Sequence, residues 1–281
     1  MAKKISNNNG SPRFGWVPDL PDSRDHIYAA PLAKLTALAP LPTKIDLRDK
    51  CPAVYNQGHI GSCTANAIGG ALQFDRKKQK LVDFVPSRLF IYYNERAMEH
   101  SIGTDAGAMI RDGIKSVVKQ GACPETEWTY DDTAADPDTG LWPPGAKPAQ
   151  KPPKKCYTDA KKFQALNYQR VQRNLGQMKG CLADGFPFVF GFSVYQSFVS
   201  QEVEDTGVLN LPAPGEPGAN ADGSPAGHAV LAVGYNDADE RFIVRNSWGA
   251  QWGMKGYFTM PYTYLLDPNL SDDFWTIRQV E

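Results

Sequence analysis

The sequence has no long apolar run, no excess of charge of one sign and no cluster of metal ligands. No stretch approaches the roughly 18 apolar residues that a membrane-spanning helix needs. Its 30 basic and 31 acidic residues leave a net charge of −1, so no polycationic surface points to nucleic acid. We therefore expect no membrane and no nucleic-acid partner, and a monomer.

Cysteine and histidine are also sparse, with five cysteines and four histidines. No CxxC pair occurs and the histidines are scattered, so we expect no structural metal and no cofactor. No apolar segment follows the two lysines near the start, which predicts a cytoplasmic protein, although a processed terminus or non-classical export stays open. In a reducing compartment the thiols would stay free, and any pairing among Cys51, Cys123, Cys156 and Cys181 is left open.

The chain divides by composition. Residues 1–42 are polar and proline-rich and predict an extended arm or pro-segment, whereas residues 43–281 predict one domain. A proline-dense stretch at 142–153 (WPPGAKPAQKPP) marks the expected border between a helical lobe, about 43–150, and a β lobe, about 151–281.

Helical periodicity dominates early and strand-like alternation late. Helices are predicted at 63–80, 86–98, 108–119 and 175–184, and strands at 187–194, 228–235, 241–246 and 256–261, with a long surface loop at 206–226. This order predicts an α+β protein with two lobes and a cleft between them.

Residues 57–63 (QGHIGSC) hold the first candidate site. Two glycines and a serine precede a helical run, so Ser62 is expected to cap the helix and Cys63 to lie in its first turn. Unpaired N–H groups there favour a thiolate and would lower the thiol pKa. Taken alone, a buried cysteine without chemical function fits the pattern equally well.

A predicted hairpin supplies the second part of the site. If Tyr235 pairs with Asp239 across the turn, His228 lies opposite Asn246, and directly opposed side chains approach to about 5 Å at Cβ. The amide would orient one imidazole nitrogen, and Trp248, on the same face, would shield that bond from water.

A cysteine, a histidine and an orienting amide form a nucleophile, a base and its support. With the motifs QGHIGSC (57–63), GHAV (227–230), NSWG (246–249), WG (252–253) and GY (256–257), the chain resembles the papain-like cysteine peptidases, among them the short bacterial members of the xylellain type. The resemblance spans about residues 44–262 and implies a papain-like fold, a helical N-terminal lobe and a β-barrel-like C-terminal lobe.

The resemblance implies Cys63 as nucleophile, His228 as base and later acid, Asn246 as orienter and Gln57 as oxyanion donor with the Cys63 N–H. It further suggests a substrate-binding set lining the cleft, which comprises Asp105, Gly107, Met109, Gly227 and Trp248. The expected partner is a peptide or protein substrate, cleaved by an endopeptidase.

The sequence departs from the family at three places. Ile60 stands where a disulfide-forming cysteine is usual, Thr64 replaces the tryptophan after the nucleophile, and Ala106 replaces a glycine. The stretch before Asp46 is also too short for the long pro-segment of secreted relatives. These departures leave the predicted catalytic residues intact and the mode of activation open.

Two other functions compete with hydrolysis: a transamidase or deamidase that uses the same residues, and a catalytically silent peptide-binding protein. The apolar arm, which holds Trp16, Ile27 and Tyr28, predicts an extended segment on the body of the enzyme. It either covers the cleft and restrains activity, or packs on the outer face and only stabilises the fold.

Overall fold

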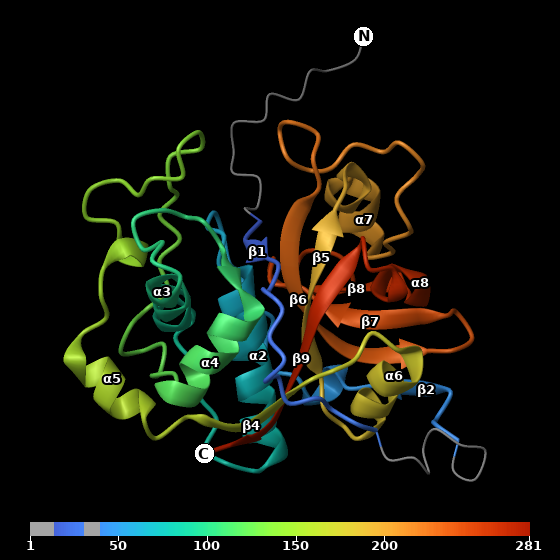
Figure 1. Ribbon diagram of the computed structural model, residues 1–281, viewed down its shortest axis with the longest axis horizontal. Coiled ribbons are helices and arrows are strands. Elements are labelled where there is room, and N and C mark those ends of the chain that lie inside the picture. The colour runs from blue at the N-terminus through green and yellow to red at the C-terminus, as the bar shows by residue number, and fades with distance from the viewer. Residues whose placement is uncertain (1–13, 31–39) are drawn as a thin grey trace.

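A group of helices and an antiparallel sheet face each other across the molecule in the computed structural model (Figure 1), which describes residues 14–30 and 40–281. The helices are α2 (Cys63–Lys78), α3 (Arg88–Met98), α4 (Ile110–Lys119), α5 (Lys154–Ala160), α6 (Leu175–Ala183), α7 (Gln201–Thr206) and α8 (Tyr262–Leu266). The strands are β1 (Trp16–Val17), β2 (Lys44–Asp46), β3 (Ala108–Met109), β4 (Ala165–Arg170), β5 (Phe188–Val194), β6 (Ala226–Asn236), β7 (Arg241–Arg245), β8 (Tyr257–Pro261) and β9 (Ser271–Val280).

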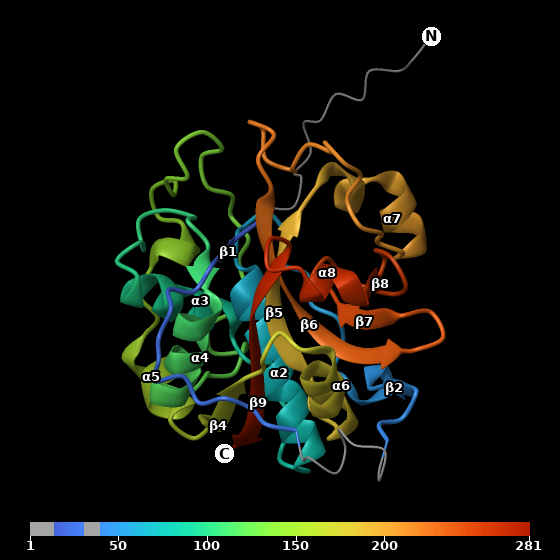
Figure 2. The same cartoon turned by 45° about the vertical axis from the view of Figure 1, so that its right-hand side comes forward.

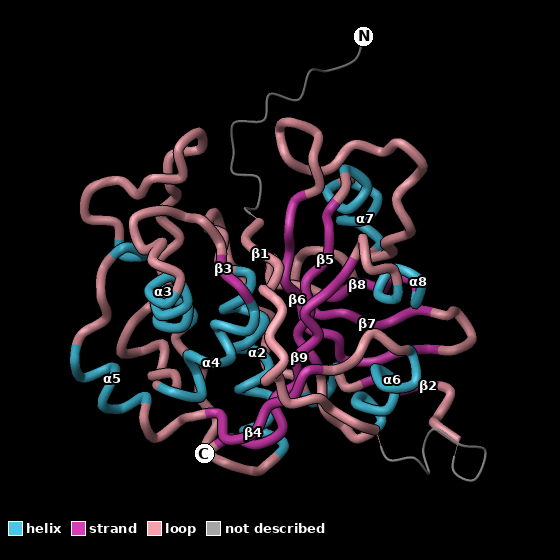
Figure 3. The backbone as a smooth tube through the Cα atoms, in the orientation of Figure 1, coloured by secondary structure: helices cyan, strands magenta, loops and turns pink. Residues whose placement is uncertain are grey.

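The long helix α2 lies between the two halves. It packs on β6, β5 and β9 on the sheet side and on α3 and α4 on the helical side. Its residues are buried along most of its length, from Cys63 to Arg76. Figure 3 shows α3, α4 and α5 on one side of α2 and most of the sheet on the other, with α6, α7 and α8 beside the sheet, which confirms the predicted two-lobed α+β fold.

The sheet has seven strands, in the order β4-β9-β5-β6-β7-β8, with β2 pairing along β6. The phenylalanines of β5, Phe188, Phe190 and Phe192, are fully buried, as expected for a central strand covered on both faces. Although β2 falls within the range predicted for the helical lobe, it belongs to the sheet. The predicted border near residue 150 stays a prediction.

The hairpin of β6 and β7 is present, but its predicted register is wrong. Tyr235 pairs with Phe242, not with Asp239, because residues 237–240 form a four-residue turn in which Glu240 adopts a φ of 51°. A register shift between Ala232 and Gly234 moves the pairing again, and β7 ends at Arg245. Because the ladder ends where Leu231 pairs with Arg245, Asn246 lies beyond it and is not the cross-strand partner of His228; on the other side of β6, His228 pairs with Phe192 of β5.

The other predicted elements lie within a few residues of the observed ones. The exception is the helix expected at 108–119, whose first two residues form the short strand β3. The predicted loop begins at Thr206, the last residue of α7, and ends at Ala226, the first residue of β6; the described residues between these two form no further helix or ladder strand. In the described part of the chain, no helix combines the length and apolar character that a membrane crossing requires.

Residues 14–30, the longer of the two described stretches of the arm, run between the lobes and then across the sheet (Figure 2). β1 pairs in parallel with β3, and farther along Ile27 bridges to Arg170 of β4. Tyr28 is buried and its hydroxyl donates to Asp184 at 2.9 Å. Residues 1–13 and 31–39 of the predicted arm lie outside the described residues.

Candidate active site

Cys63 is the first residue of α2, and its side chain is fully buried where the helix meets the sheet. The backbone N–H of Ala229, in β6, donates to the Cys63 Sγ at 3.4 Å. Because Ala229 follows His228, this bond places the thiol beside the strand that carries the histidine.

His228 and Asn246 are joined by a hydrogen bond of 2.8 Å between Nε2 and Oδ1. The backbone N–H of Ser247, which can only donate, points to the same Asn246 atom at 2.8 Å, so that atom is the amide oxygen. Nε2 therefore carries the proton and Nδ1 keeps its lone pair. Nδ1 has no hydrogen-bond partner among the described residues, so it can accept a proton from a thiol.

Aromatic rings enclose this pair. Trp248 lies over the His228 ring with centroids 5.1 Å apart, and Phe192 and Phe198 lie at 5.7 and 6.0 Å. Burial lowers the His228 pKa to about 4, against the opposite effect of the bond to Asn246. In this state the imidazole is neutral at physiological pH.

Gln57 is buried in the loop before α2. Its Oε1 accepts from the Ser247 hydroxyl at 2.7 Å, and its Nε2 donates to the Ile60 carbonyl at 3.0 Å. Its backbone N–H donates to the Ser247 carbonyl at 2.8 Å. The residue after the orienting amide thus fixes the predicted oxyanion donor, a link that the pattern NSWG alone did not disclose.

The predicted cap by Ser62 is wrong. Ser62 occupies the N-cap position, but its side chain makes no capping bond and instead lies 2.6 Å from the Tyr130 hydroxyl. Tyr130 also donates to the Gln57 carbonyl at 2.9 Å, and the Arg88 guanidinium lies 4.0 Å above its ring. This support comes from a loop about 70 residues away in sequence, so local sequence signals could not reveal it.

The predicted substrate-binding residues separate into two groups. Gly107, Met109, Gly227 and Trp248 border the arm in the cleft. Asp105 points inward: its carboxylate accepts from the Gly61 N–H at 3.0 Å and from the Tyr92 hydroxyl at 2.6 Å. It therefore holds the loop that leads to Cys63, and its substrate-binding role stays a prediction without support from this geometry.

The arm places Gly15 directly over the nucleophile loop. Its N–H donates to the Gly227 carbonyl at 2.9 Å and its carbonyl accepts from the Ala108 N–H at 2.7 Å. A Cβ at Gly15 would lie 1.8 Å from the Gly61 carbonyl oxygen, so only glycine fits there. The arm backbone consequently bridges the sheet and the helical lobe at the catalytic residues.

The two neighbours of Gly15 in sequence, Phe14 and Trp16, also pack against the residues around the site. The Phe14 ring lies 5.9 Å from the His228 ring. The Trp16 indole packs where a Cβ on Gly191 would approach it to 2.0 Å, and its Nε1 donates to Asp273 at 3.0 Å. Of the two placements expected for the arm, the segment around Gly15 occupies the cleft, and the segment around Tyr28 packs on the body.

The position of the arm over Cys63 also explains why the predicted direction of the thiol pKa shift is wrong. The thiol pKa was expected to be lowered by the helix terminus, but burial raises the Cys63 pKa to about 12, although the backbone N–H groups of Ala229 and Gly15 act to lower it. Removal from water outweighs the helix terminus while the arm is in place.

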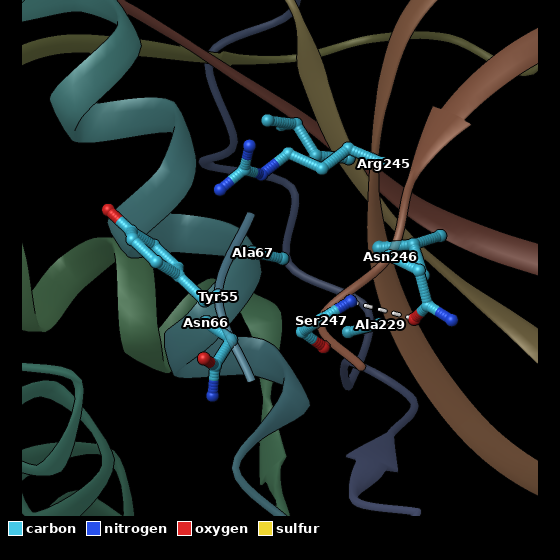
Figure 4. A pocket seen from close by; sticks show the side chains of 9 residues that line it. Tyr55, Asn66, Ala67, Ala229, Arg245, Asn246 and Ser247 are labelled. Carbon is cyan, nitrogen blue, oxygen red and sulfur yellow. Dashed lines mark hydrogen bonds between the residues drawn. The ribbon is translucent and has the colours of Figure 1, made fainter. Parts of the chain in front are cut away.

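Behind the catalytic residues lies a cavity of about 10 Å³, with room for a single water molecule at most. Figure 4 shows Tyr55, Asn66 and Ala67 on its helical side and Ala229, Arg245, Asn246 and Ser247 on its sheet side. It is too small for a substrate, so the cleft under the arm is the candidate binding site.

These residues and their bonds match a known family. The model of the papain family cysteine protease matches residues 41–265, and the chain therefore belongs to this family and is a cysteine peptidase. In a solved structure, xylellain, a cysteine protease from Xylella fastidiosa, is 46% identical; the match covers 99% of this chain and 100% of that one, with a TM-score of 0.86.

Two further relatives extend this comparison. An uncharacterized peptidase-like protein of Acanthamoeba polyphaga mimivirus is 41% identical over 96% of this chain and 88% of its own length. A cathepsin L-like peptidase of Aedes aegypti is 30% identical over 78% of this chain, and the match spans 59% of that relative's length.

The bond between His228 and Asn246 predicts unequal losses on substitution. His228→Ala removes the proton acceptor and should lower kcat/KM by about 10²–10⁴-fold. Asn246→Ala leaves the ring in place but unoriented, so its loss should be smaller. Both values are measured with a short peptide-coumarin substrate, and circular dichroism of each variant checks the fold. Equal losses in folded variants would contradict a purely orienting role.

Proposed function

We propose that this cysteine peptidase is an endopeptidase in which Cys63 is the nucleophile and His228 the general base. His228 Nδ1 takes the thiol proton, and the resulting Cys63 thiolate attacks the scissile carbonyl carbon. Nδ1 then protonates the leaving amine, and water, deprotonated by the same nitrogen, hydrolyses the thioester. The observation that carries the proposal is the fixed His228 tautomer beside a thiol that contacts Ala229.

The oxyanion of the tetrahedral intermediate needs preorganised donors. The Gln57 side-chain amide, fixed through Ser247, and the Cys63 backbone N–H are the groups we assign to this role. One such donor typically lowers the barrier by about 2.7–4 kcal/mol. Gly107, Met109, Gly227 and Trp248 would bind the substrate once the arm has left.

We further propose that the arm restrains the enzyme. With Gly15 over the catalytic loop, Cys63 and His228 are both fully buried, so a substrate cannot reach the thiol. The pKa directions in this state favour a neutral thiol and a neutral imidazole, which is the unreactive form of the pair. Activity would then require the segment around Gly15 to leave the cleft.

The remaining expectations concern the substrate, the oligomeric state, the compartment and other partners. The substrate is a peptide or protein, and we propose action as a monomer in the cytoplasm, without nucleic acid or membrane as partner. The near-neutral balance of charge supports the absence of a nucleic-acid partner.

Replacement of the nucleophile tests the assignment directly. Cys63→Ala should lower kcat/KM by at least about a thousandfold while the fold is kept, because the other thiols lie outside the site. Peptide-coumarin hydrolysis under reducing conditions gives the rate. Activity within tenfold of the unchanged chain would contradict the assignment to Cys63.

Gly15→Ala tests the restraint in the full-length chain. A truncation of the arm would also remove the buried Tyr28. The added methyl collides with the Gly61 carbonyl, and overpacking of this kind costs about 1–3 kcal/mol. Docking should weaken about tenfold and kcat/KM should rise several-fold. Gly103→Ala, where a Cβ meets nothing within 4 Å, is the matched control. The same kcat/KM in all three proteins would exclude the gating role.

The restraint should depend on pH through Asp19. In the docked arm, burial is the main cause that raises the Asp19 pKa from 3.8 to about 7, and the nearby Asp273 adds to the rise, whereas Arg111 lowers this pKa. Two other charged groups face Asp19: Arg170, at 3.9 Å, and Glu99. A carboxyl whose pKa is raised by docking favours docking below its free pKa, and this contribution is lost as the pH rises to about 7.

Dividing kcat/KM of the Gly15→Ala protein by that of the unchanged chain cancels the pH dependence of the chemistry. We expect this ratio to fall between about pH 4 and pH 7, because the unchanged chain releases its arm more readily at the higher pH. Asp19→Asn should flatten the dependence. A ratio that rises with pH would contradict this linkage.

A further inference from the structure

A second cluster of reactive side chains lies away from the catalytic residues. The sulfur atoms of Cys123 and Cys156 and a carboxylate oxygen of Glu127 all lie within 4.8 Å of one another. Both cysteines are buried in a small apolar cluster with Phe90 and Ala160. Cys123 is fully buried and Cys156 is 2% exposed. No step of the proposed hydrolysis uses them.

The two sulfurs interact directly. Burial raises the pKa of both thiols, and for Cys123 the neighbouring Cys156 adds to the rise. The Cys156 thiol also donates to the Glu127 carbonyl at 3.7 Å. A disulfide needs a sulfur–sulfur distance of about 2.0 Å, and rotations about χ1 with a small backbone movement can close a gap of this size.

A metal ion suits the same cluster less well. Structural zinc sites are mostly closed by four cysteine or histidine ligands, whereas the group found among the described residues has two sulfurs and one carboxylate. The Lys155 ammonium lies 2.7 Å from Glu127 Oε1, so it already neutralises this carboxylate and would repel a bound cation.

We propose that Cys123 and Cys156 form a reversible disulfide that fastens the segment between them. The oxidant is a small-molecule disulfide such as oxidised glutathione. One cysteine thiolate attacks it and releases a first reduced thiol, and the second cysteine displaces the other half. Both cysteines are oxidised together, two electrons reduce the small disulfide to two thiols, and the two cysteine protons leave with them.

The segment that the disulfide would close is long and has little regular structure. It makes a loop of about 34 residues, in which the one helical element before α5 is the short 3₁₀ turn Lys147–Ala149. Such a segment opens locally at low cost, which gives the oxidant access to buried thiols. It also holds Tyr130, whose hydroxyl supports the Gln57 backbone at 2.9 Å. The disulfide would therefore stabilise the position of Tyr130 and, through it, the loop that leads to Cys63.

The test needs no enzymatic activity. The full chain is incubated with oxidised glutathione, excess reagent is removed, remaining thiols are blocked, and a non-reducing peptide map identifies linked peptides. We expect a Cys123–Cys156 link, slower amide hydrogen exchange over residues 124–155, and a Tm about 5–10 °C above that of the reduced protein. Dithiothreitol should reverse all three changes.

Cys123→Ser and Cys156→Ser should each abolish the Tm difference between oxidised and reduced protein. Cys181→Ser, at another fully buried thiol, is the matched control and should keep it. The map of the unchanged chain decides the question even if a variant does not fold. A disulfide between Cys123 or Cys156 and another cysteine would overturn the proposal, and so would glutathione bound to Cys123 or Cys156 in place of the disulfide between them. So would zinc found in the purified protein by elemental analysis together with a Tm lowered by a chelator.

Discussion

The contact between the start of α2 and β6 is the constraint on which the catalytic geometry depends. One element carries Cys63 and the other His228, and the bond from the Ala229 N–H to the thiol sets their separation. Arg245, at the end of β7, strengthens this junction because its guanidinium donates to the carbonyls of Pro52 and Ala53, at 2.6 and 2.5 Å, just before the loop of Gln57. Nucleophile and base thus lie on regular elements, which hold them more accurately than loops would.

Water exclusion explains why a well-formed site can be inactive. Three of the rings around His228, those of Trp248, Phe192 and Phe198, belong to the peptidase domain, whereas Phe14 and Gly15 of the arm complete the enclosure of the site. In a dry site both charged forms are penalised, and the observed directions, a raised thiol pKa and a lowered imidazole pKa, both oppose proton transfer to form an ion pair. In the restraint that we propose, the arm would therefore oppose the reaction electrostatically as well as sterically.

The sequence predicted the fold, and it predicted that Cys63, His228 and Asn246 come together, because short motifs and periodicity are local properties. It failed where the outcome depends on distant parts of the chain. The turn at residues 237–240 and the shift near Ala232 changed the hairpin register, yet Asn246 still reaches His228 because it leaves the end of β7. Ser62 lost its capping role to Tyr130, and the burial of Cys63 depends on Gly15, about 50 residues earlier. No local pattern encodes such contacts.

A short arm suffices for restraint because it is tethered. Farther along the arm, the Arg111 guanidinium pairs with Asp25 at 2.7 Å, and the buried Tyr28 donates to Asp184 at 2.9 Å. These contacts keep the segment near Gly15 close to the cleft at an effective concentration that is in the millimolar range for short flexible linkers. A segment so confined needs only two backbone hydrogen bonds and one buried indole to exclude a substrate present at lower concentration. The same tether would let the segment leave and return without cleavage, so the restraint that we propose is an equilibrium that pH, a competing peptide or a change at Gly15 should shift.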